Sequence, residues 1–433
     1  MQMNRWKWRE LDLDQKKLIM TRASADITDH VQTVMPIIEA VRTRGDEALI
    51  EYTKAFDRVV LQPGNLRVSD EEWQRGLAMV TEVMAETLSY AAGNIRRFHA
   101  AQMPEPIWMM EVDEGIMAGE KVTPISDVAL YVPRGKGSFP SVLLMLGTPA
   151  VVAGVPRIIV ITPPNEKGEV DPAILFAANL LGIKEIYKVG GAQAIAAVAY
   201  GTESVPKCAK VIGPGNPYVT AAKRLLAGVI DPGVPAGPSE AIILADEGAN
   251  PHHVALDLLI EAEHGPDSAS LLVTPSLKLA DDVEKELIQL INTMESDKRR
   301  EFATTVLSRY GGLVEVNSME EAVDFVNEYA PEHMEVQVRE PFALLPQLKN
   351  AGEILLGDHT PITLCNFLLG PNAILPTGRN ARTISAVSIH DFIKRSSIGY
   401  VTKEGFAKVR DLAARFADME GFETHARAVR ERE

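Results

Sequence analysis

A short helical segment carries residue types that bind transition metals. In Glu261-Ala-Glu-His264, a carboxylate and an imidazole stand three residues apart, so on a helix both side chains lie on one face and can reach one ion. Carboxylate oxygen together with imidazole nitrogen suits zinc or a neighbouring transition metal. Charged pairs on helices are more often a solvated surface, so the pair alone does not establish a metal site.

A second segment carries groups for acid–base chemistry. The run Tyr329-Ala-Pro-Glu332-His333 places a carboxylate beside an imidazole, and the proline before them favours the boundary of an element over its interior. Both side chains can be tuned towards neutral pH, so they can divide proton transfer between them. The acidic first turn of a helix explains the same run equally well, and the local sequence leaves both interpretations open.

Three glycine-rich turns are candidates for contact with a cofactor. They are Val189-Gly-Gly-Ala-Gln193, Ile212-Gly-Pro-Gly-Asn216 and Val132-Pro-Arg-Gly-Lys-Gly-Ser138. The first two separate an apolar strand-like run from a helical run, which is where the cofactor crevice of an α/β sheet forms and where a helix N-terminus favours phosphate. The standard GxGxxG and GxxxxGK[ST] signatures are missing. Tight turns without a ligand explain the glycines about equally well.

The elements that must position these residues follow an α/β pattern. Short β-branched runs alternate with helix-like segments, which predicts βαβ units with parallel sheets. These runs span residues 128–132, 157–162, 184–189, 210–212, 241–245, 271–274, 312–316, 335–338 and 353–356. The Pro- and Gly-rich run 231–238 is the clearest junction between two such units. Apolar residues spaced by three and four predict helices within 25–101, and helical character returns after Thr383.

Composition and charge exclude several classes of protein. The 433 residues contain 44 Lys and Arg against 59 Asp and Glu, a net charge of −15, which argues against nucleic acids and anionic membranes as partners because surplus positive charge binds both. The N-terminal segment lacks the apolar core of a secretory signal. The longest apolar stretch, 141–155, is shorter than the ~20 residues that span a bilayer. Two cysteines, Cys208 and Cys365, cannot form a disulfide framework, and we expect a cytoplasmic protein.

Several long motifs together resemble the histidinol dehydrogenase family. In chain order they are YVPRGKGSFPS, KVGGAQAIAAVAYGTESVP, KVIGPGNPYVTAAKRLL, PAGPSEAIILADEGA, EAEHGPDS, YAPEHM, GPNAILPT and KEGF. The resemblance covers nearly the whole chain and is specific for the family, but less specific for the substrate. It implies an α/β fold of two incomplete Rossmann-like domains with parallel sheets and helical N- and C-terminal segments, in a domain-swapped homodimer. It also implies oxidation of a primary alcohol through an aldehyde to a carboxylate, with two molecules of NAD and a bound zinc.

The element pattern and the resemblance together predict how the chain divides. Residues 1–24 are expected to form an N-terminal helical arm, and residues 127–238 an α/β domain that binds NAD. Residues 25–126 and 239–380 are expected to form the other α/β domain, which carries the metal and catalytic residues. Residues 381–433 are expected to form a helical tail that reaches the partner subunit.

The resemblance assigns catalytic and cofactor roles to five residues. Glu332 and His333 would be the general bases, which activate first the alcohol and then the water that hydrates the aldehyde. Cofactor contacts would fall on Tyr131, Gln193 and Asn216. A base must lie within hydrogen-bond reach of the hydroxyl, because hydride leaves a carbon only as its oxygen loses a proton.

The resemblance also assigns a metal site and a substrate site. The metal ligands would be Glu261, His264, Asn366 and His425. The substrate site would include Ser239, Glu420 and Arg134, with Glu420 and His425 supplied by the partner subunit. The family usually has Gln in place of Glu261 and Asp in place of Asn366, so the charge around the ion is moved without being changed and zinc stays compatible with the site.

The substrate pocket departs further from the family pattern. Ala373 replaces a histidine that helps to hold histidinol, and Ile362 replaces an acidic residue that could pair with a substrate ammonium, while Arg134 and Lys136 add positive charge to a loop. These changes point to a small anionic alcohol such as 2,3-dihydroxypropane-1-sulfonate, the substrate of the sulfopropanediol dehydrogenase branch. Basic loop residues facing solvent would explain the loop equally well. A true L-histidinol dehydrogenase and a non-catalytic metal- or nucleotide-binding relative are the alternatives.

Overall fold

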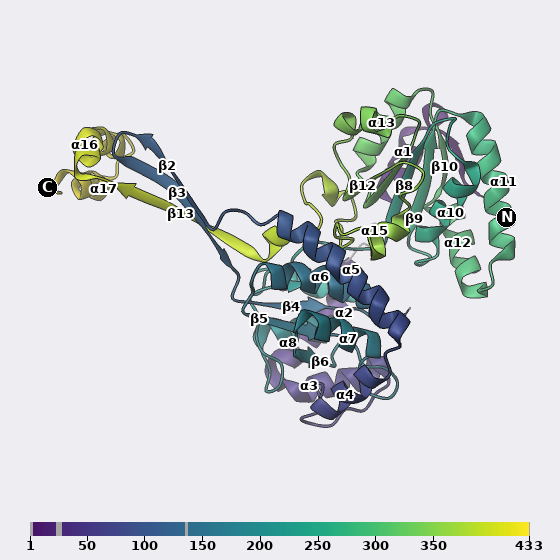
Figure 1. Ribbon diagram of the computed structural model, residues 1–433, viewed down its shortest axis with the longest axis horizontal. Coiled ribbons are helices and arrows are strands. Elements are labelled where there is room, and N and C mark those ends of the chain that lie inside the picture. The colour runs from purple at the N-terminus through teal and green to yellow at the C-terminus, as the bar shows by residue number, and fades with distance from the viewer. Residues whose placement is uncertain (1–2, 23–27, 135–136, 433) are drawn as a thin grey trace.

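The computed structural model describes residues 3–22, 28–134 and 137–432. This part of the chain contains a six-stranded, a four-stranded and a three-stranded sheet. In Figure 1 the first two belong to separate α/β bodies, and the third forms an arm that projects away from both and ends at the C-terminus. The α/β class with parallel sheets and helical segments, which the sequence predicts, is confirmed.

The six-stranded sheet is parallel throughout, in the order β1–β10–β9–β8–β11–β12. Its strands are β1 (Arg5–Lys7), β8 (Glu240–Ala245), β9 (Ala269–Thr274), β10 (Gly312–Glu315), β11 (His333–Gln337) and β12 (Glu353–Leu356). One face packs on α10 (Pro251–Ala262), α11 (Leu277–Thr293) and α12 (Asp297–Arg309). The other packs on α1 (Leu13–Thr21) and α13 (Met319–Tyr329). Both faces are covered, which explains why the central strands are continuous apolar runs.

The four-stranded sheet is also parallel, in the order β6–β5–β4–β7. Its strands are β4 (Asp127–Tyr131), β5 (Arg157–Ile161), β6 (Glu185–Tyr187) and β7 (Val211–Ile212). One face packs on α2 (Thr28–Arg44), α3 (Asp46–Tyr52), α8 (Gly191–Tyr200) and α9 (Pro217–Leu225). The other packs on α4 (Asp70–Ala78), α5 (Glu82–Ala101), α6 (Pro140–Val152) and α7 (Pro172–Leu181). The chain leaves β4 towards β5 but returns to its other side with β7, so a topological switch point lies between β4 and β7.

The helices within 28–101 pack on the four-stranded sheet, which differs from the predicted division. The predicted division places residues 25–126 in one domain with residues 239–380. Instead, Val34 of α2 and Ile95 of α5 are buried in the two cores that flank the four-stranded sheet. Helical periodicity reveals that a helix has an apolar stripe, but it does not reveal which sheet will cover that stripe.

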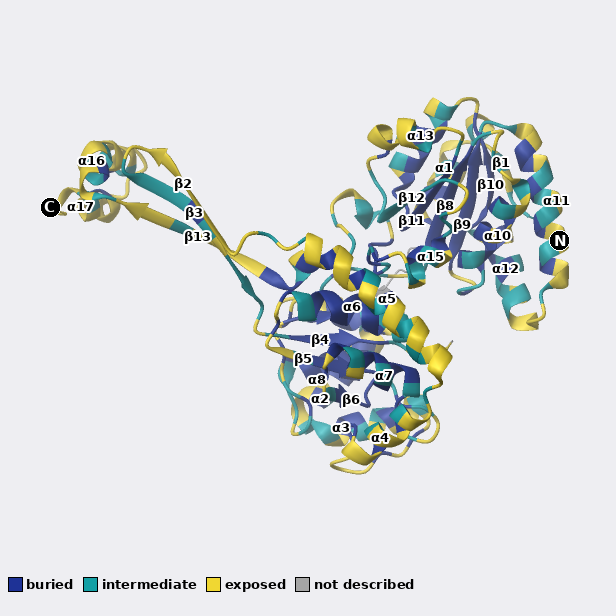
Figure 2. Cartoon of the chain, viewed as in Figure 1, coloured by how far each residue is buried: buried dark blue, intermediate teal, exposed yellow. Residues whose placement is uncertain are grey.

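The arm combines two distant parts of the chain. The strands β2 (Ile107–Asp113), β3 (Ile116–Pro124) and β13 (Ile393–Val401) form its antiparallel sheet, and α16 (Lys403–Met419) and α17 (Glu423–Arg430) follow. The region 381–433, predicted to be a helical tail, is therefore helical mainly from Lys403 onwards. Much of the arm is exposed (Figure 2). Its exposed large apolar side chains include Ile107, Trp108, Met110, Tyr400, Leu412, Phe416 and Met419.

The N-terminal segment belongs to the six-stranded sheet. β1 pairs in parallel with β10 at the edge of this sheet, and Ile19 and Met20 of α1 are buried in its core. A capping box between Asp12 and Gln15 starts α1. The predicted helical arm over residues 1–24 is thus correct for α1, whereas Arg5–Lys7 form a strand. No helix within the described ranges is long and apolar enough to cross a bilayer.

Candidate active site

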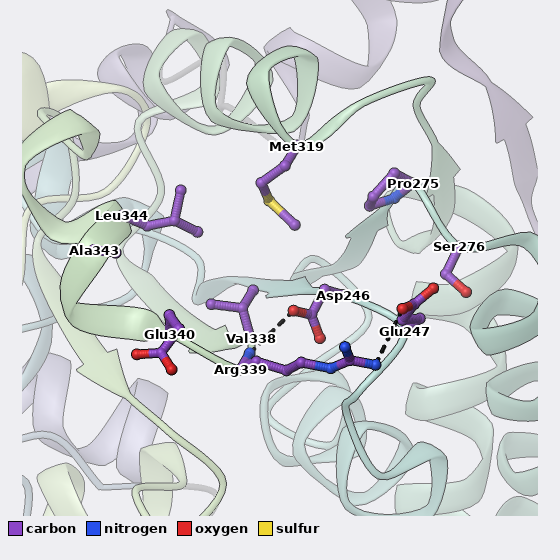
Figure 3. Close-up of a pocket in the computed structure, with 10 residues that line it drawn as sticks. All are labelled: Asp246, Glu247, Pro275, Ser276, Met319, Val338, Arg339, Glu340, Ala343 and Leu344. Atoms are coloured by element: carbon purple, nitrogen blue, oxygen red, sulfur yellow. Dashed lines mark hydrogen bonds and ion pairs between the residues drawn. The ribbon is translucent and has the colours of Figure 1, made fainter.

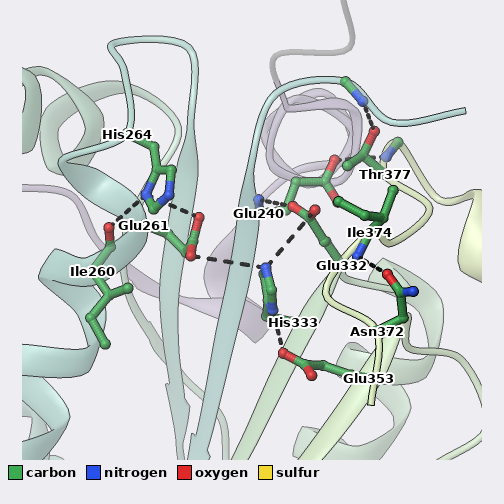
Figure 4. Close-up of polar contacts among 12 residues, drawn as sticks. Glu240, Ile260, Glu261, His264, Glu332, His333, Glu353, Asn372, Ile374 and Thr377 are labelled. Atoms are coloured by element: carbon green, nitrogen blue, oxygen red, sulfur yellow. Dashed lines mark hydrogen bonds and ion pairs between the residues drawn. The ribbon is translucent and has the colours of Figure 1, made fainter. Parts of the chain in front are cut away.

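Four predicted site residues lie close together at the amino edge of the six-stranded sheet, namely Glu261, His264, Glu332 and His333. His333 is the first residue of β11, and Glu332 precedes it directly. The register of the parallel strands places His333 beside Ala241 of β8 on one side and beside Glu353 of β12 on the other. Figure 4 shows His333 surrounded by the carboxylates of Glu261, Glu332 and Glu353. Strand register therefore brings together side chains that are far apart in the sequence.

His333 has carboxylates near both of its ring nitrogens. Its Nδ1 lies 2.5 Å from Glu353 Oε1, and its Nε2 lies 3.9 Å from both Glu332 Oε1 and Glu261 Oε1. Burial alone would lower the pKa of His333, but the carboxylates of Glu332, Glu353 and Glu261 outweigh it and raise the pKa to about 10. Glu353 thereby fixes the ring so that Nε2 faces the two other carboxylates.

Glu332 is a buried carboxyl group that a backbone hydrogen bond holds in place. Its Oε2 accepts a hydrogen bond of 2.9 Å from the backbone N–H of Glu240. Burial raises the pKa of Glu332 to about 8; the positive charge of His333 opposes this shift, and the carboxylates of Glu261 and Glu240 add to it. A carboxyl group with a pKa near neutrality can both accept and return a proton, as general acid–base chemistry requires.

Glu261 and His264 lie close enough to each other for both to bind one metal ion. Glu261 lies in the last turn of α10, and its side chain is buried, with an exposed fraction of 1%. Neither of its carboxylate oxygens accepts a hydrogen bond. His264 Nδ1 lies 2.8 Å from the carbonyl oxygen of Ile260 and 3.4 Å from Glu261 Oε2. Because a carbonyl oxygen only accepts, Nδ1 donates to it, and a histidine held in this way can present its other nitrogen, Nε2, to a metal. A buried carboxylate without hydrogen bonds is costly unless a cation compensates it, so these residues fit a metal ion.

The other two predicted ligands are placed differently. Asn366 belongs to α15 (Ile362–Phe367), which packs against α10 through the contact of Ile362 and Cys365 with Ile260. His425 lies on α17 in the arm, is exposed and contacts the ring of Phe422. Figure 1 shows α17 at the far left of the molecule and α10 in the body at the right. Within the described ranges, no three His, Cys, Asp or Glu side chains form a metal site by themselves.

The predicted substrate residues do not all converge within one chain. Ser239 directly precedes Glu240 and β8, at the edge that carries His333. Glu420 lies in the arm, exposed, next to the end of α16. Arg134 donates a 3.2 Å hydrogen bond to the carbonyl oxygen of Pro164. Its positive charge also lies near the carboxylate of Asp57. Burial raises the pKa of Asp57 to about 6, and the charge of Arg134 opposes this rise. Lys136 lies outside the described residues.

The predicted cofactor residues lie at the carboxyl edge of the four-stranded sheet. Tyr131 ends β4, and its hydroxyl oxygen accepts a 3.1 Å hydrogen bond from the N–H of Gly191 at the start of α8; burial raises the pKa of Tyr131 to about 12. Gln193 is buried on α8, and its Oε1 accepts no hydrogen bond. Asn216 follows β7 and caps α9 by accepting from the N–H of Val219. This carboxyl edge is where open α/β sheets bind cofactors.

The opposite edge of the six-stranded sheet carries an open pocket. Its volume is about 490 Å³, and its lining includes Asp246, Glu247, Ser276, Arg339 and Glu340. Figure 3 shows Arg339 reaching to Glu247, an ion pair of 3.0 Å. This pocket contains none of the predicted site residues. The candidate active site is therefore defined by convergent polar groups and not by this cavity.

Sequence reasoning missed three residues that support the site. Glu353 orients His333, and Glu240 supplies the N–H that binds Glu332. Arg22 forms a buried ion pair with Glu240 and donates to the carbonyl oxygen of Tyr329. An acidic residue at the first position of an apolar strand was the available signal for Glu240 and Glu353, because such a charge enters a core only where a partner receives it. Nothing local marked Arg22.

Comparison with known proteins places this geometry in a family. A model of the histidinol dehydrogenase family matches residues 20–433. A protein of Colwellia psychrerythraea named histidinol dehydrogenase homolog is 50% identical over 97% of this chain and 94% of its own length. The histidinol dehydrogenase of Synechocystis sp. is 47% identical over 99% of this chain and 98% of its own length. The crystal structure of histidinol dehydrogenase from Elizabethkingia anophelis has a TM-score of 0.92 and 35% identity, covering 99% of this chain and 97% of that chain. The chain therefore belongs to the histidinol dehydrogenase family.

Proposed function

We propose that the chain is an NAD- and zinc-dependent dehydrogenase that oxidises a primary alcohol through an aldehyde to a carboxylate, using two molecules of NAD. The observation that carries the proposal is the buried Glu332–His333 pair, with Glu353 bound to the far nitrogen of the imidazole. A carboxyl group and an imidazole with pKa values near 8 and 10 form an acid–base pair at the edge of a core.

The pair has two proton transfers to perform. In the first oxidation, the base takes the proton of the substrate hydroxyl while hydride leaves the carbon. In the second, the base takes a proton from the water that adds to the aldehyde, and hydride then leaves the hydrate. His333 Nε2 and the carboxylate of Glu332 face the same space, so one can accept a proton while the other returns one. A cation beside Glu261 would lower the pKa of His333 and convert it to its basic form.

The chain offers residues for both bound groups. Bound NAD supplies the hydride acceptor, and bound zinc supplies a positive charge that holds and polarises the substrate oxygen. Tyr131, Gln193 and Asn216 would hold the dinucleotide, since they lie at the carboxyl edge of the four-stranded sheet, where such sheets bind cofactors. Glu261 and His264 would hold the metal together with Asn366 and with His425 of the partner subunit.

We further propose that the arm completes the active site of a second subunit in a homodimer. The arm exposes several large apolar side chains, including Trp108, Phe416 and Met419. Apolar surface of this extent is typical of a site that binds another protein. It also carries Glu420 at the end of α16 and His425 on α17, and Figure 1 shows these two helices far from α10 of the same chain. A second copy that receives the arm would cover the apolar surface and bring these residues to the site.

Subunit mixing tests the shared site. His264→Ala and His425→Ala are each expected to be inactive as homodimers. In a mixed dimer, one site combines both defects and the other has none, so random mixing of equal amounts should recover about a quarter of wild-type activity. Each variant mixed with itself is the control. Mixed dimers without any activity would refute a site built from two subunits.

For the substrate, we propose a small anionic alcohol such as 2,3-dihydroxypropane-1-sulfonate. Ile362 packs with Ala241 and Cys365 beside the site, and neither Ile362 nor Ala373 can bind a substrate ammonium. In keeping with this, four relatives with 48% to 50% identity carry the name histidinol dehydrogenase homolog. L-histidinol is the second candidate substrate, because the Synechocystis relative named histidinol dehydrogenase is nearly as similar, at 47% identity.

A panel of alcohols, scored by NADH formed per substrate, tests the function. Two NADH per sulfonated diol would support the four-electron reaction, and one would limit it to aldehyde formation. A kcat/KM for L-histidinol above ~10⁴ M⁻¹s⁻¹, the low end of ordinary enzymes, would favour histidinol instead. Glu332→Gln should abolish NADH formation, and Glu328→Gln, an exposed glutamate on α13, should leave it unchanged. Absence of NADH with every alcohol would favour a non-catalytic binding protein.

A further inference from the structure

A pair of carboxyl groups is buried next to the candidate active site. Asp257 of α10 and Glu335 of β11 have exposed fractions of 7% and 1%, and their side chains are hydrogen-bonded to each other. The side-chain amide of Gln337 donates to Asp257 Oδ2 at 2.7 Å and to Glu335 Oε2 at 3.0 Å. Neither acid belongs to the proton-transfer pair or to the proposed metal ligands.

Glu335 also holds the start of another helix. Its Oε1 accepts a 2.7 Å hydrogen bond from the backbone N–H of Ile362, the first residue of α15. The N-cap residue of α15, Pro361, makes no side-chain capping bond. Glu335 therefore receives, from a different element, an N–H that helix geometry leaves without a partner.

The three elements joined by these contacts are the ones that carry the active site. Glu261 lies one turn beyond Asp257 on α10, and Asn366 lies one turn beyond Ile362 on α15. His333 lies two residues before Glu335 on β11, so both side chains project from the same face of the strand. The carboxyl pair thus connects, at a single buried point, the supports of the proposed metal ligands and of the proton-transfer pair.

Two carboxyl groups that bond to each other must share a proton, because two negative charges at this distance in a core repel strongly. Burial and the neighbouring Asp257 raise the pKa of Glu335 to about 9, so the proton stays in place at neutral pH. The other groups that face the pair are His253 of α10 and Asp358, which are bonded to each other at 2.7 Å, and the neutral amide of Gln337.

We propose that Asp257 and Glu335 form a proton-sharing clamp that positions α10, β11 and α15 and thereby sets the metal affinity of the active site. This inference rests on the zinc site of the proposed function. Both acids are positioning residues, since they act through Glu261 and Asn366 and do not touch the reacting atoms. The clamp holds while the shared proton is present and opens when that proton is lost.

The test compares two replacements of Glu335. In Glu335→Gln, the amide oxygen can still accept from Ile362 and the amide nitrogen can donate to Asp257 without a titrating proton, at the cost of the 3.0 Å contact from Gln337. In Glu335→Leu, every one of these bonds is lost. Glu315→Leu is the matched control, because Glu315 is a buried acid of β10 in the same sheet and is bonded to Arg5 instead.

The measurement is zinc affinity of the metal-free, full-length protein by competition with a chromophoric chelator. At pH 7.5 we expect Glu335→Leu to bind zinc at least about tenfold more weakly than wild type, the usual effect of removing a support of metal ligands, and Glu335→Gln and Glu315→Leu to stay within about threefold. At pH 9.5, wild type should lose about fourfold in affinity relative to Glu335→Gln, since about a quarter of Glu335 would retain its proton.

Two results would overturn the clamp: equal zinc affinities for wild type and Glu335→Leu at pH 7.5, or equal pH dependence for wild type and Glu335→Gln. The second comparison stands even if Glu335→Leu fails to fold. If wild type itself binds no zinc, the proposed function fails at its metal site, and the clamp fails with it. If wild type binds zinc and the variants do not differ, only the clamp is refuted.

Discussion

Replacing Lys223 with methionine is predicted to change how the stability of the protein depends on pH. Lys223 lies on α9, buried, and its ammonium donates a 2.6 Å hydrogen bond to the carbonyl oxygen of Gly213. Among the described residues no carboxylate forms an ion pair with Lys223, and Asp231 is bound to Lys210 instead. Burial therefore lowers the pKa of Lys223 to about 7, with Asp231 opposing and Lys210 adding to the shift.

The magnitude follows from the two pKa values. The folded-state pKa of about 7 is lower than the unfolded value of about 10.4, so the unfolded chain binds more protons between these pH values and stability rises with pH. Below pH 7 both states carry the charge, and the folded state bears its full burial cost. From pH 6 to pH 9 the contribution of Lys223 to the free energy of unfolding should increase by about 3 kcal/mol. Methionine has a similar volume and no such dependence.

Urea unfolding of both proteins at pH 6 and pH 9, followed by circular dichroism, measures this difference. Subtracting the variant from wild type cancels the other titrating groups. We expect the wild type to gain about 3 kcal/mol relative to Lys223→Met between the two pH values. A difference between the proteins that does not change with pH would refute the argument, because it would mean that Lys223 keeps its ordinary pKa in the folded state.

Three further predictions concern the active site. Glu353→Gln should lower kcat/KM about 10- to 100-fold, because the carboxylate that orients His333 loses its charge; a change below twofold would show that His333 does not need this support. Removal of metal by a chelator should abolish NADH formation, and added zinc should restore it; full activity without metal would contradict the zinc assignment. Gly191→Ala should weaken NAD binding at least about tenfold in a calorimetric titration, since Gly191 has φ +65° and an added Cβ would lie 2.6 Å from Gln193 Oε1; unchanged affinity would place the cofactor elsewhere.

Much of the fold could be predicted from local patterns. The β-branched runs at 128–132, 157–162 and 271–274 correspond to β4, β5 and β9, because a strand buried on both faces must be a continuous apolar run. The helical spacing within 28–101 likewise corresponds to α2 and α5. The exposed hairpin of β2 and β3 had no such signal: β2 is solvent-exposed along its length, so no burial pattern marks it.

The sequence predicted the main residues of the candidate site but not the residues that position them. Glu332 and His333 were candidates from their residue types, and the resemblance to the family assigned their roles. Glu353, which orients His333, and the pair of Asp257 and Glu335 were not, since the residues that give each acid its role lie on other elements.

The sequence by itself determined the α/β class, most of the parallel strands and the residues that resemble a family's active site, because these depend on patterns within a few consecutive residues. Tertiary structure alone decided that α2 and α5 cover the four-stranded sheet, that β3 pairs with the distant β13, and that Glu353 meets His333. The physical reason is that pairing and burial join residues far apart in the chain. A charge at the start of a strand becomes functional only when the register of the next strand places a partner beside it.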